Sequence, residues 1–281
     1  MRFDCHMHTR PFTQYGDMEH FDQQAFLKDL RSAGFDGGAV YSLSPNTYTD
    51  LTAEQRMDAA LTVCEGQKTL FPFFWIAPMD GEAEAQVDLA VEKGFAAFKM
   101  SGILYNPACE RSLTIIERIA AAGKPIMFHS GICWDAENSA ANHKPANFEA
   151  MLRIPNLRFC LAHVGWPWYD ECIAVYGKIR NAFVSKRRSC EMFIDVTPGT
   201  PKVYREEVFR KLLGCYDMRN NLMFGLDSNT AKYDAEKSKT WQAMDNALYE
   251  KYVDRDVEDF KDHVYGLNLL RFLGIRESDC R

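Results

Sequence analysis

The chain has 281 residues, of which 33 are Lys or Arg and 39 are Asp or Glu, so its formal net charge at pH 7 is −6. With 47% hydrophobic and 26% charged residues, it has the composition of a folded globular protein, which excludes a disordered or collagen-like polymer. The acidic balance, with no basic run longer than Lys186–Arg188, also argues against a nucleic-acid partner.

The cysteines and the lack of long apolar segments indicate the cellular compartment. The nine cysteines are an odd number and include no Cys-x-x-Cys pair, so we do not expect the disulfide framework of a secreted protein. The first residues enter an apolar run without the pattern of a signal peptide. No apolar stretch approaches the ~18 residues of a membrane span. We therefore expect a cytoplasmic protein that binds no membrane.

Eight short apolar runs recur along the chain and predict buried strands. In chain order they cover residues 2–8, 38–43, 70–76, 95–100, 125–129, 158–163, 192–196 and 222–227. Each run is mostly apolar on both faces, as expected for a parallel strand that is covered on both sides.

The segments between these runs have helical periodicity, and several end in a glycine, such as Gly34 and Gly94, shortly before the next run. This alternation without a linker predicts an α/β fold, a single (β/α)8 TIM barrel that forms one domain over residues 1–281. We allow for distortion of the barrel and expect extra C-terminal helices from about residue 234 on. No Gly-x-Gly-x-x-Gly motif follows the first run, which disfavours a dinucleotide-binding fold.

Polar side chains stand where the predicted strands end. The first run ends in His6 and His8, the fifth in His129, the sixth in His163 and the eighth in Asp227. In a TIM barrel the carboxyl ends of the strands line the active site. A single histidine at a strand end is more often a buried structural residue, so the functional indication comes from the whole set converging on one rim.

The first run has two histidines that are two residues apart. Since a strand alternates with a period of two, we expect Asp4, His6 and His8 on one side and Cys5 and Met7 on the other. Two imidazoles on one side of a strand can bind the same metal ion.

The residue types at the rim suit a divalent metal. Neutral imidazoles together with a carboxylate are ligands for zinc or a related ion that keeps one position open for water. A bound metal lowers the pKa of that water toward ~7. Asp227 could ligate the metal and take the proton of the water, and His163 could be a further ligand or a group that polarises the substrate.

The order of these residues resembles the amidohydrolase superfamily, and the surrounding sequence is most similar to its amidohydrolase-2 branch of TIM-barrel metal-dependent hydrolases. That branch includes aminocarboxymuconate-semialdehyde decarboxylase, related aromatic-acid decarboxylases and lactonases. The segments that carry the resemblance are residues 3–8, 94–99, 125–131, 161–165, 224–227 and 265–273.

The resemblance implies one divalent metal ion, with zinc favoured over manganese. Its ligands would be His6, His8, His129 and Asp227, with His163 and Asp227 as the catalytic residues. It also implies a homo-oligomer. Many decarboxylases of the branch have an acidic residue where this chain has His6, which favours hydrolysis. The aminocarboxymuconate enzyme also has the two-histidine motif, so decarboxylation stays open.

Four residues near the rim are candidates for binding the substrate. Lys99 ends the fourth run, where the binuclear members have a carboxylated lysine, but a cation that pairs with an anionic substrate or with Asp227 is the favoured interpretation. Arg10 follows the first run and suits a carboxylate. Trp134 and Trp166 lie in the loops after the fifth and sixth runs, where they could form the walls of a substrate site or pack on the barrel.

The sequence thus predicts a metal-dependent hydrolase in which a metal-activated water attacks an amide, lactone or ester of a small, anionic substrate. The alternative is non-oxidative decarboxylation of an aromatic or unsaturated carboxylic acid. A non-catalytic metal-binding protein is the least favoured hypothesis, because five polar residues at a barrel mouth have no evident packing purpose.

Overall fold

The computed structural model describes residues 1–9, 18, 21–102, 105–134 and 136–280. Its strands form one parallel sheet in the order β8-β7-β6-β5-β4-β3-β2-β1-β9. The bounds are β1 (Phe3–His8), β2 (Gly37–Tyr41), β3 (Leu70–Trp75), β4 (Ala97–Met100), β5 (Ile126–Phe128), β6 (Arg158–Leu161), β7 (Glu191–Asp195), β8 (Leu222–Met223) and β9 (Ser228–Asn229). Each predicted apolar run contains one of the strands β1 to β8 or most of it.

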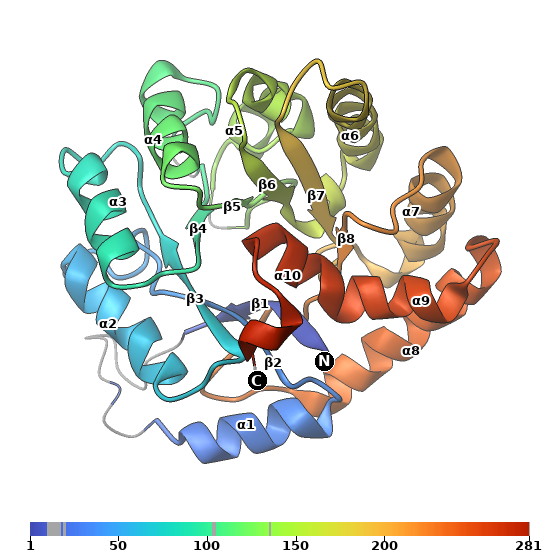
Figure 1. Cartoon of the computed structure of the whole chain (residues 1–281), viewed down its shortest axis with the longest axis horizontal. Helices are drawn as coiled ribbons and strands as arrows, with labels where there is room; N and C mark the ends of the chain where they lie inside the picture. Colours follow the sequence, from blue (N-terminus) through green and yellow to red (C-terminus); the bar gives the residue numbers. More distant parts are fainter. Residues whose placement is uncertain (10–17, 19–20, 103–104, 135, 281) are drawn as a thin grey trace.

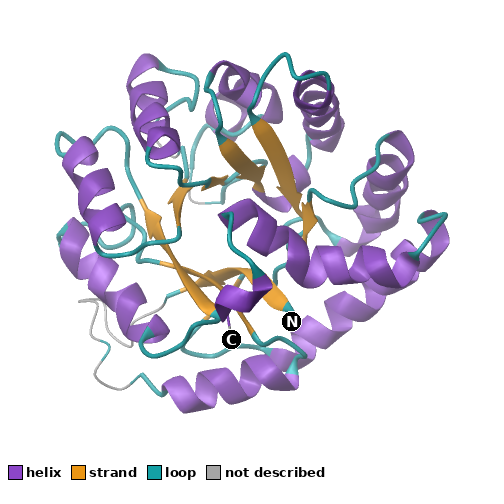
Figure 2. Ribbon diagram, in the orientation of Figure 1, coloured by secondary structure: helices purple, strands orange, loops and turns teal. Residues whose placement is uncertain are grey.

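Helices surround the curled sheet, as Figure 1 and Figure 2 show. The α-helices are α1 (Gln23–Ser32), α2 (Ala53–Cys64), α3 (Ala83–Glu92), α4 (Glu110–Ala121), α5 (Ser139–Asn142), α6 (Tyr169–Val184), α7 (Lys202–Cys215), α8 (Ala235–Tyr252), α9 (Val257–Asp262) and α10 (Asn268–Leu273). The last three confirm the predicted C-terminal helices. No helix in the described part of the chain has both the length and the apolar character needed to cross a membrane.

Local sequence signals set the ends of several helices. A capping box begins α2, where the side chain of Thr52 accepts from the backbone N–H of Gln55 and the Gln55 side chain accepts from that of Thr52. The side chain of Asp22 caps α1 in the same position. As predicted, Gly34 and Gly94 follow their helices with φ angles of 89° and 82°, values that residues with a side chain rarely adopt.

The sheet is TIM-barrel-like, but it is not the closed eight-stranded barrel that the sequence predicted. The eighth run contains only the short β8, which pairs with β7, and the strand that pairs with β1 is β9, directly after the run. Between them Asp227 has a left-handed backbone with φ of 54°, and the N–H of Leu226 donates to the carboxylate of Asp4 instead of to a strand. The backbone contact across this gap is a hydrogen bond of 3.0 Å from Cys5 N to Phe224 O.

Two apolar clusters lie on the two sides of the sheet. The outer cluster joins the strands to the surrounding helices. The inner cluster joins alternate strand residues, such as Phe73 and Phe193, to Leu269 and Phe272 of α10. In Figure 1 α10 crosses the middle of the ring of strands. One end of the sheet is therefore filled with apolar side chains, which leaves the polar residues to the other end.

A bulge in β1 overturns the predicted alternation of that strand. Cys5 belongs to the inner cluster and Met7 to the outer one, because the register with β2 shifts between Asp4 and Met7. Asp4 turns outward and accepts a hydrogen bond of 2.7 Å from the hydroxyl of Tyr233. The two histidines of β1 both lie against the inner face, where their rings contact Tyr41.

Candidate active site

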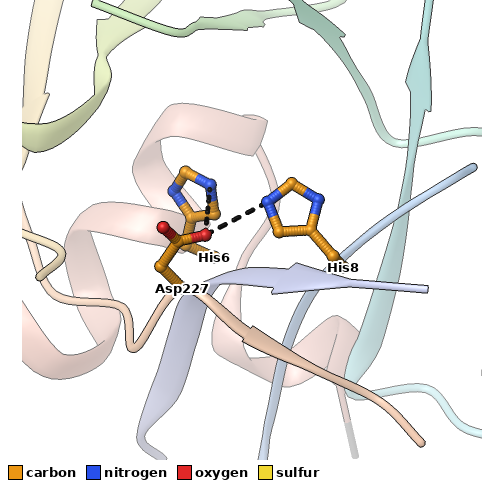
Figure 3. Close-up of side chains that lie close together, drawn as sticks. All are labelled: His6, His8 and Asp227. Atoms are coloured by element: carbon orange, nitrogen blue, oxygen red, sulfur yellow. Dashed lines mark ion pairs between the residues drawn. The ribbon is translucent and has the colours of Figure 1, made fainter. Parts of the chain in front are cut away.

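The end of β1 and the chain after β8 bring three of the predicted ligands together. Asp227 Oδ1 lies 3.2 Å from Nε2 of His8 and 3.5 Å from Nε2 of His6. Figure 3 shows the two imidazoles turned toward this carboxylate. One ligand atom of each residue lies within 4.8 Å of the other two, so the three residues could hold one divalent ion.

The protonation of His6 shows that the donor set fits a metal. Its Nδ1 lies 2.7 Å from Oδ2 of Asp195, and burial, together with the charge of Lys99, lowers the pKa of His6 to about 3. A neutral His6 whose Nδ1–H donates to Asp195 has a lone pair on Nε2. This lone pair faces Oδ1 of Asp227 at 3.5 Å. Two acceptors that face each other repel, and a cation between them removes the repulsion.

Asp227 is ionised in this arrangement. Burial by itself would raise its pKa, but the hydrogen bond with His8 holds the pKa of Asp227 well below its usual range. Its side chain is 33% exposed, so the carboxylate faces both the two imidazoles and the cavity above them. It can therefore bind a metal on one side and contact a substrate on the other.

His163 lies next to this group, with its ring 5.2 Å from the ring of His6. Its Nδ1 is 2.8 Å from the hydroxyl of Thr197, and burial lowers the pKa of His163. The backbone of His163 and Val164 is left-handed, with φ angles of 59° and 54°. Strain of this kind is found where the surroundings hold a functional residue in place.

His129 lies one step further along a row of imidazoles. The rings follow one another as His8, His6, His163, His129 and His143, with centroids 5.0–5.2 Å apart. Nε2 of His129 lies 3.2 Å from the carbonyl of Ile132. His129 is thus near the three-residue group without being part of it, and its role as fourth ligand stays a prediction.

Lys99 is buried beside the site. Its ammonium lies 5.0 Å from the ring centre of Tyr41 and 5.9 Å from that of Trp75, and among the described residues it has no hydrogen-bond partner. Burial lowers the pKa of Lys99. A buried cation without a hydrogen-bond partner among the described residues is available to an anionic ligand.

A cavity of about 840 Å³ opens above the three-residue group. Its wall includes Trp75 and Trp134, and Trp134 is 85% exposed. Hydroxyl and amide groups form much of the remaining wall, from residues Ser42, Ser44, Asn46, Thr47, Tyr48, Ser101, Ser228 and Asn229. Trp166 is half-buried and packs on Tyr204, with their rings 5.9 Å apart. Arg10 lies outside the described residues.

The sequence analysis missed two buried residues of the site, Asp195 and His143. Asp195 ends β7, and its one signal in the sequence is an acidic residue inside an apolar run. His143 is 1% exposed, and within the described part of the chain neither of its ring nitrogens has a hydrogen-bond partner. Several other buried polar atoms without a partner among the described residues lie in the last residues of strands or in the loops after them, in Thr9, Trp75, Lys99, Thr200 and Thr230. Such atoms are rare in folded proteins, so the group of them near these strand ends makes this rim a candidate binding site.

Comparison with known proteins identifies the family. The amidohydrolase family model matches residues 3–275. No curated protein matches the sequence significantly.

Solved structures share the fold. One is a probable 2-pyrone-4,6-dicarboxylic acid hydrolase of Acinetobacter baumannii, with 10% identity, a TM-score of 0.64, and 98% of this chain and 99% of that chain covered. The manganese complex of 5-carboxyvanillate decarboxylase from Novosphingobium aromaticivorans has 12% identity, a TM-score of 0.65, and coverage of 98% and 96%. For 2,6-dihydroxybenzoate decarboxylase from Rhizobium the identity is 11%, the TM-score 0.62, and the coverage 98% and 99%. These similarities include both hydrolases and decarboxylases.

Proposed function

Because the chain belongs to the amidohydrolase family, we propose that it is a metal-dependent hydrolase acting on an amide, lactone or ester of a small anionic molecule. His6, His8 and Asp227 would hold one divalent ion, zinc or manganese, with His129 as the fourth ligand. The observation that carries the proposal is the pair of facing acceptors, His6 Nε2 and Asp227 Oδ1, at 3.5 Å. A divalent ion there would polarise the carbonyl and supply a water acidic enough to lose its proton near neutral pH.

Asp227 and His163 supply the proton transfers. Asp227 is ionised and faces the cavity, so it can accept the proton of the attacking water and return it to the leaving group. His163 has its Nδ1 on the Thr197 hydroxyl, so its Nε2 is free to exchange a hydrogen bond or a proton with the substrate.

The surroundings select an anionic substrate with a flat or apolar part. Lys99, a buried cation without a partner among the described residues, would pair with a substrate carboxylate. Trp75 and Trp134 would pack against its body. Arg10 and Trp166 remain candidates for further contacts from the neighbouring loops.

Decarboxylation is the second candidate. A planar aromatic acid would also fit between the tryptophans with its carboxylate near Lys99, and two of the solved structures with this fold are aromatic-acid decarboxylases. Here His163 or Asp227 would protonate the ring carbon that loses carbon dioxide.

The test is a screen of lactones, amides, esters and aromatic acids with the zinc-loaded and the manganese-loaded protein. We expect hydrolysis, in which each turnover produces a new carboxylate. Release of carbon dioxide without a new carboxylate would replace the first candidate with the second. Metal retention is a second readout, since His6→Ala is expected to lose the ion, whereas His163→Ala keeps it. Equal loss in both variants would contradict the separation of ligand and catalyst.

A further inference from the structure

The carboxylate of Asp195 lies at the centre of the site, although no proton transfer described above uses it. It is fully buried at the end of β7. Oδ2 accepts from Nδ1 of His6 at 2.7 Å. Oδ1 accepts from the backbone N–H of His163 at 3.2 Å, from that of Thr197 at 2.8 Å and from the Thr197 hydroxyl. One side chain thus contacts the ring of His6 directly and reaches the imidazole of His163 through the Thr197 hydroxyl.

The positions of the protons follow from this pattern. An ionised carboxylate only accepts hydrogen bonds, so the proton of His6 must be on Nδ1. The Thr197 hydroxyl has one proton, which it donates to Asp195. Its oxygen can then only accept from His163, so the proton of His163 is on Nδ1 as well. Both imidazoles are left with a lone pair on Nε2.

We propose that Asp195 is a positioning residue that fixes the tautomers of both His6 and His163, the first directly and the second through Thr197. The inference rests on the proposed function, because a tautomer with the proton on Nε2 could not bind a metal through that atom. The same carboxylate thus prepares a metal ligand and a proton acceptor together.

Two glycines hold these groups in close contact. A Cβ atom on Gly225 would lie 2.6 Å from Cβ of His6 and 2.8 Å from Cγ2 of Thr197. A Cβ atom on Gly199 would lie 2.6 Å from Cγ of His163. Only glycine fits at these two positions, so the backbone of both loops lies directly against His6, Thr197 and the ring of His163. The hydrogen bonds to Asp195 and Thr197 then decide which nitrogen of each ring has the proton.

Asp195→Asn is the informative variant, because the site dictates how the amide turns. Three donors surround Oδ1, so the amide oxygen takes that place and the NH2 group faces Nδ1 of His6. The NH2 group must donate there, which moves the proton of His6 to Nε2 while His163 keeps its own. We expect zinc affinity to fall about 10- to 100-fold.

Thr197→Val is the complementary variant. It removes the hydroxyl that accepts from Nδ1 of His163 and keeps the hydrogen bond between His6 and Asp195. We expect zinc affinity to be unchanged and the tautomer of His163 to be released. Thr197→Ser, which restores the hydroxyl, should restore the tautomer. Asp4→Asn is the matched control, since Asp4 is equally buried and accepts from the backbone N–H of His6 but not from its ring.

The experiment measures the ring nitrogens of the histidines by ¹⁵N NMR in the metal-free protein, followed by zinc competition titrations. In the parent and in Asp4→Asn we expect both His6 and His163 to have their proton on Nδ1. Asp195→Asn should lose this tautomer at His6, and Thr197→Val should lose it at His163. The inference is overturned if His6 keeps its Nδ1 proton in Asp195→Asn or if His163 is unchanged in Thr197→Val. If Asp195→Asn does not fold, Thr197→Val and Thr197→Ser still test whether the hydrogen bonds from Asp195 through Thr197 fix the tautomer of His163. A parent protein that binds no zinc but shows these tautomers would refute the proposed function and leave the role of Asp195 intact.

Discussion

Between α7 and α8 lies a buried ion pair, Arg205 with Asp245, that differs from the metal-site group in how its charges are matched. The guanidinium donates to both carboxylate oxygens at 2.7 and 2.6 Å, and it lies over the rings of Phe209 and Trp241 at 4.9 and 4.8 Å. Each oxygen of Asp245 thus faces a donor. At the rim, by contrast, an imidazole lone pair faces the oxygen of Asp227. Nη1 of Arg205 has no hydrogen-bond partner among the described residues, but the carboxylate of Asp245 is matched. A carboxylate whose two oxygens both face donors needs no further ligand, whereas one that faces a lone pair implies a ligand.

The largest effect of a substitution is expected on activity, at the mismatched pair of His6 and Asp227. Asp227→Asn removes a metal ligand and the proton acceptor, so kcat/KM with an identified substrate should fall about 10²- to 10⁴-fold. The metal-free variant should be about as stable as the parent, because the amide gains a donor toward Nε2 of His6 while it loses the hydrogen bond with His8. Activity assays and urea unfolding of the metal-free proteins measure both effects. A clear loss of stability would mean that Asp227 serves the fold.

A substitution in the pair of Arg205 and Asp245 should have the opposite effect, lowering stability but not zinc affinity. Arg205→Met leaves Asp245 buried without its partner, so we expect the free energy of unfolding to fall by about 3–5 kcal/mol. Zinc affinity of the folded fraction should stay at the parental value. Urea unfolding and zinc competition, carried out on one preparation, test both statements. If Arg205→Met leaves the stability unchanged, the pair of Arg205 and Asp245 does not stabilise the fold, and its contrast with the pair of His6 and Asp227 is lost.

Asp4 supplies a pH-dependent test of buried charge. Burial raises its pKa to about 7, above the ordinary value, so the folded protein retains a proton that the unfolded chain loses near pH 4. This contribution to stability is fully present below about pH 4 and is lost as the pH rises to about 7, at about 1.4 kcal/mol for each pKa unit.

Asp4→Asn cannot ionise, so its stability should not show this loss. The difference in unfolding free energy between parent and variant is measured from pH 4 to 8. It separates the contribution of Asp4 to the pH dependence of stability from that of His6. The His6 contribution has the opposite sign, because its lowered pKa reduces stability as the pH falls. A difference that does not change with pH would contradict the raised pKa of Asp4.

The smallest effect is expected at the cavity wall, outside both clusters. Trp134 is 85% exposed, so Trp134→Ala should leave the melting temperature unchanged while KM rises about 5-fold, or ~1 kcal/mol. Trp166→Ala is the matched variant, since Trp166 packs on Tyr204. It should lower the melting temperature more than it raises KM. If Trp134→Ala lowers the melting temperature and Trp166→Ala mainly raises KM, then Trp166 contacts the substrate and Trp134 serves the fold.

The strand positions and most of the rim could be predicted from the sequence because they depend on local patterns. Apolar runs marked the strands, and the residues that end them marked the rim. The break between β8 and β9 could not be predicted, because it depends on a contact between Leu226 and Asp4, which are far apart in the chain. The bulge in β1 is likewise a property of its pairing with β2.

The missed residues of the site show a second limit. Asp195 was hidden because it lies within an apolar run, and its importance comes from three chain segments that donate to it. His143 lies after the short helix α5, a position that sequence patterns assign to a surface loop, yet it packs on His129 with their rings 5.0 Å apart. Sequence patterns thus locate strand ends, whereas hydrogen-bond partners around them depend on the assembled sheet.

The most direct test of the account is the metal content of the protein, measured by plasma mass spectrometry after purification without an affinity tag of histidines or a chelator. The account predicts about one equivalent of zinc or manganese per chain, and its loss in His8→Ala. Two equivalents would contradict the mononuclear site and point to Lys99 as a bridging ligand. No bound metal, even after reconstitution, would contradict the proposal that the facing acceptors of His6 and Asp227 share a cation.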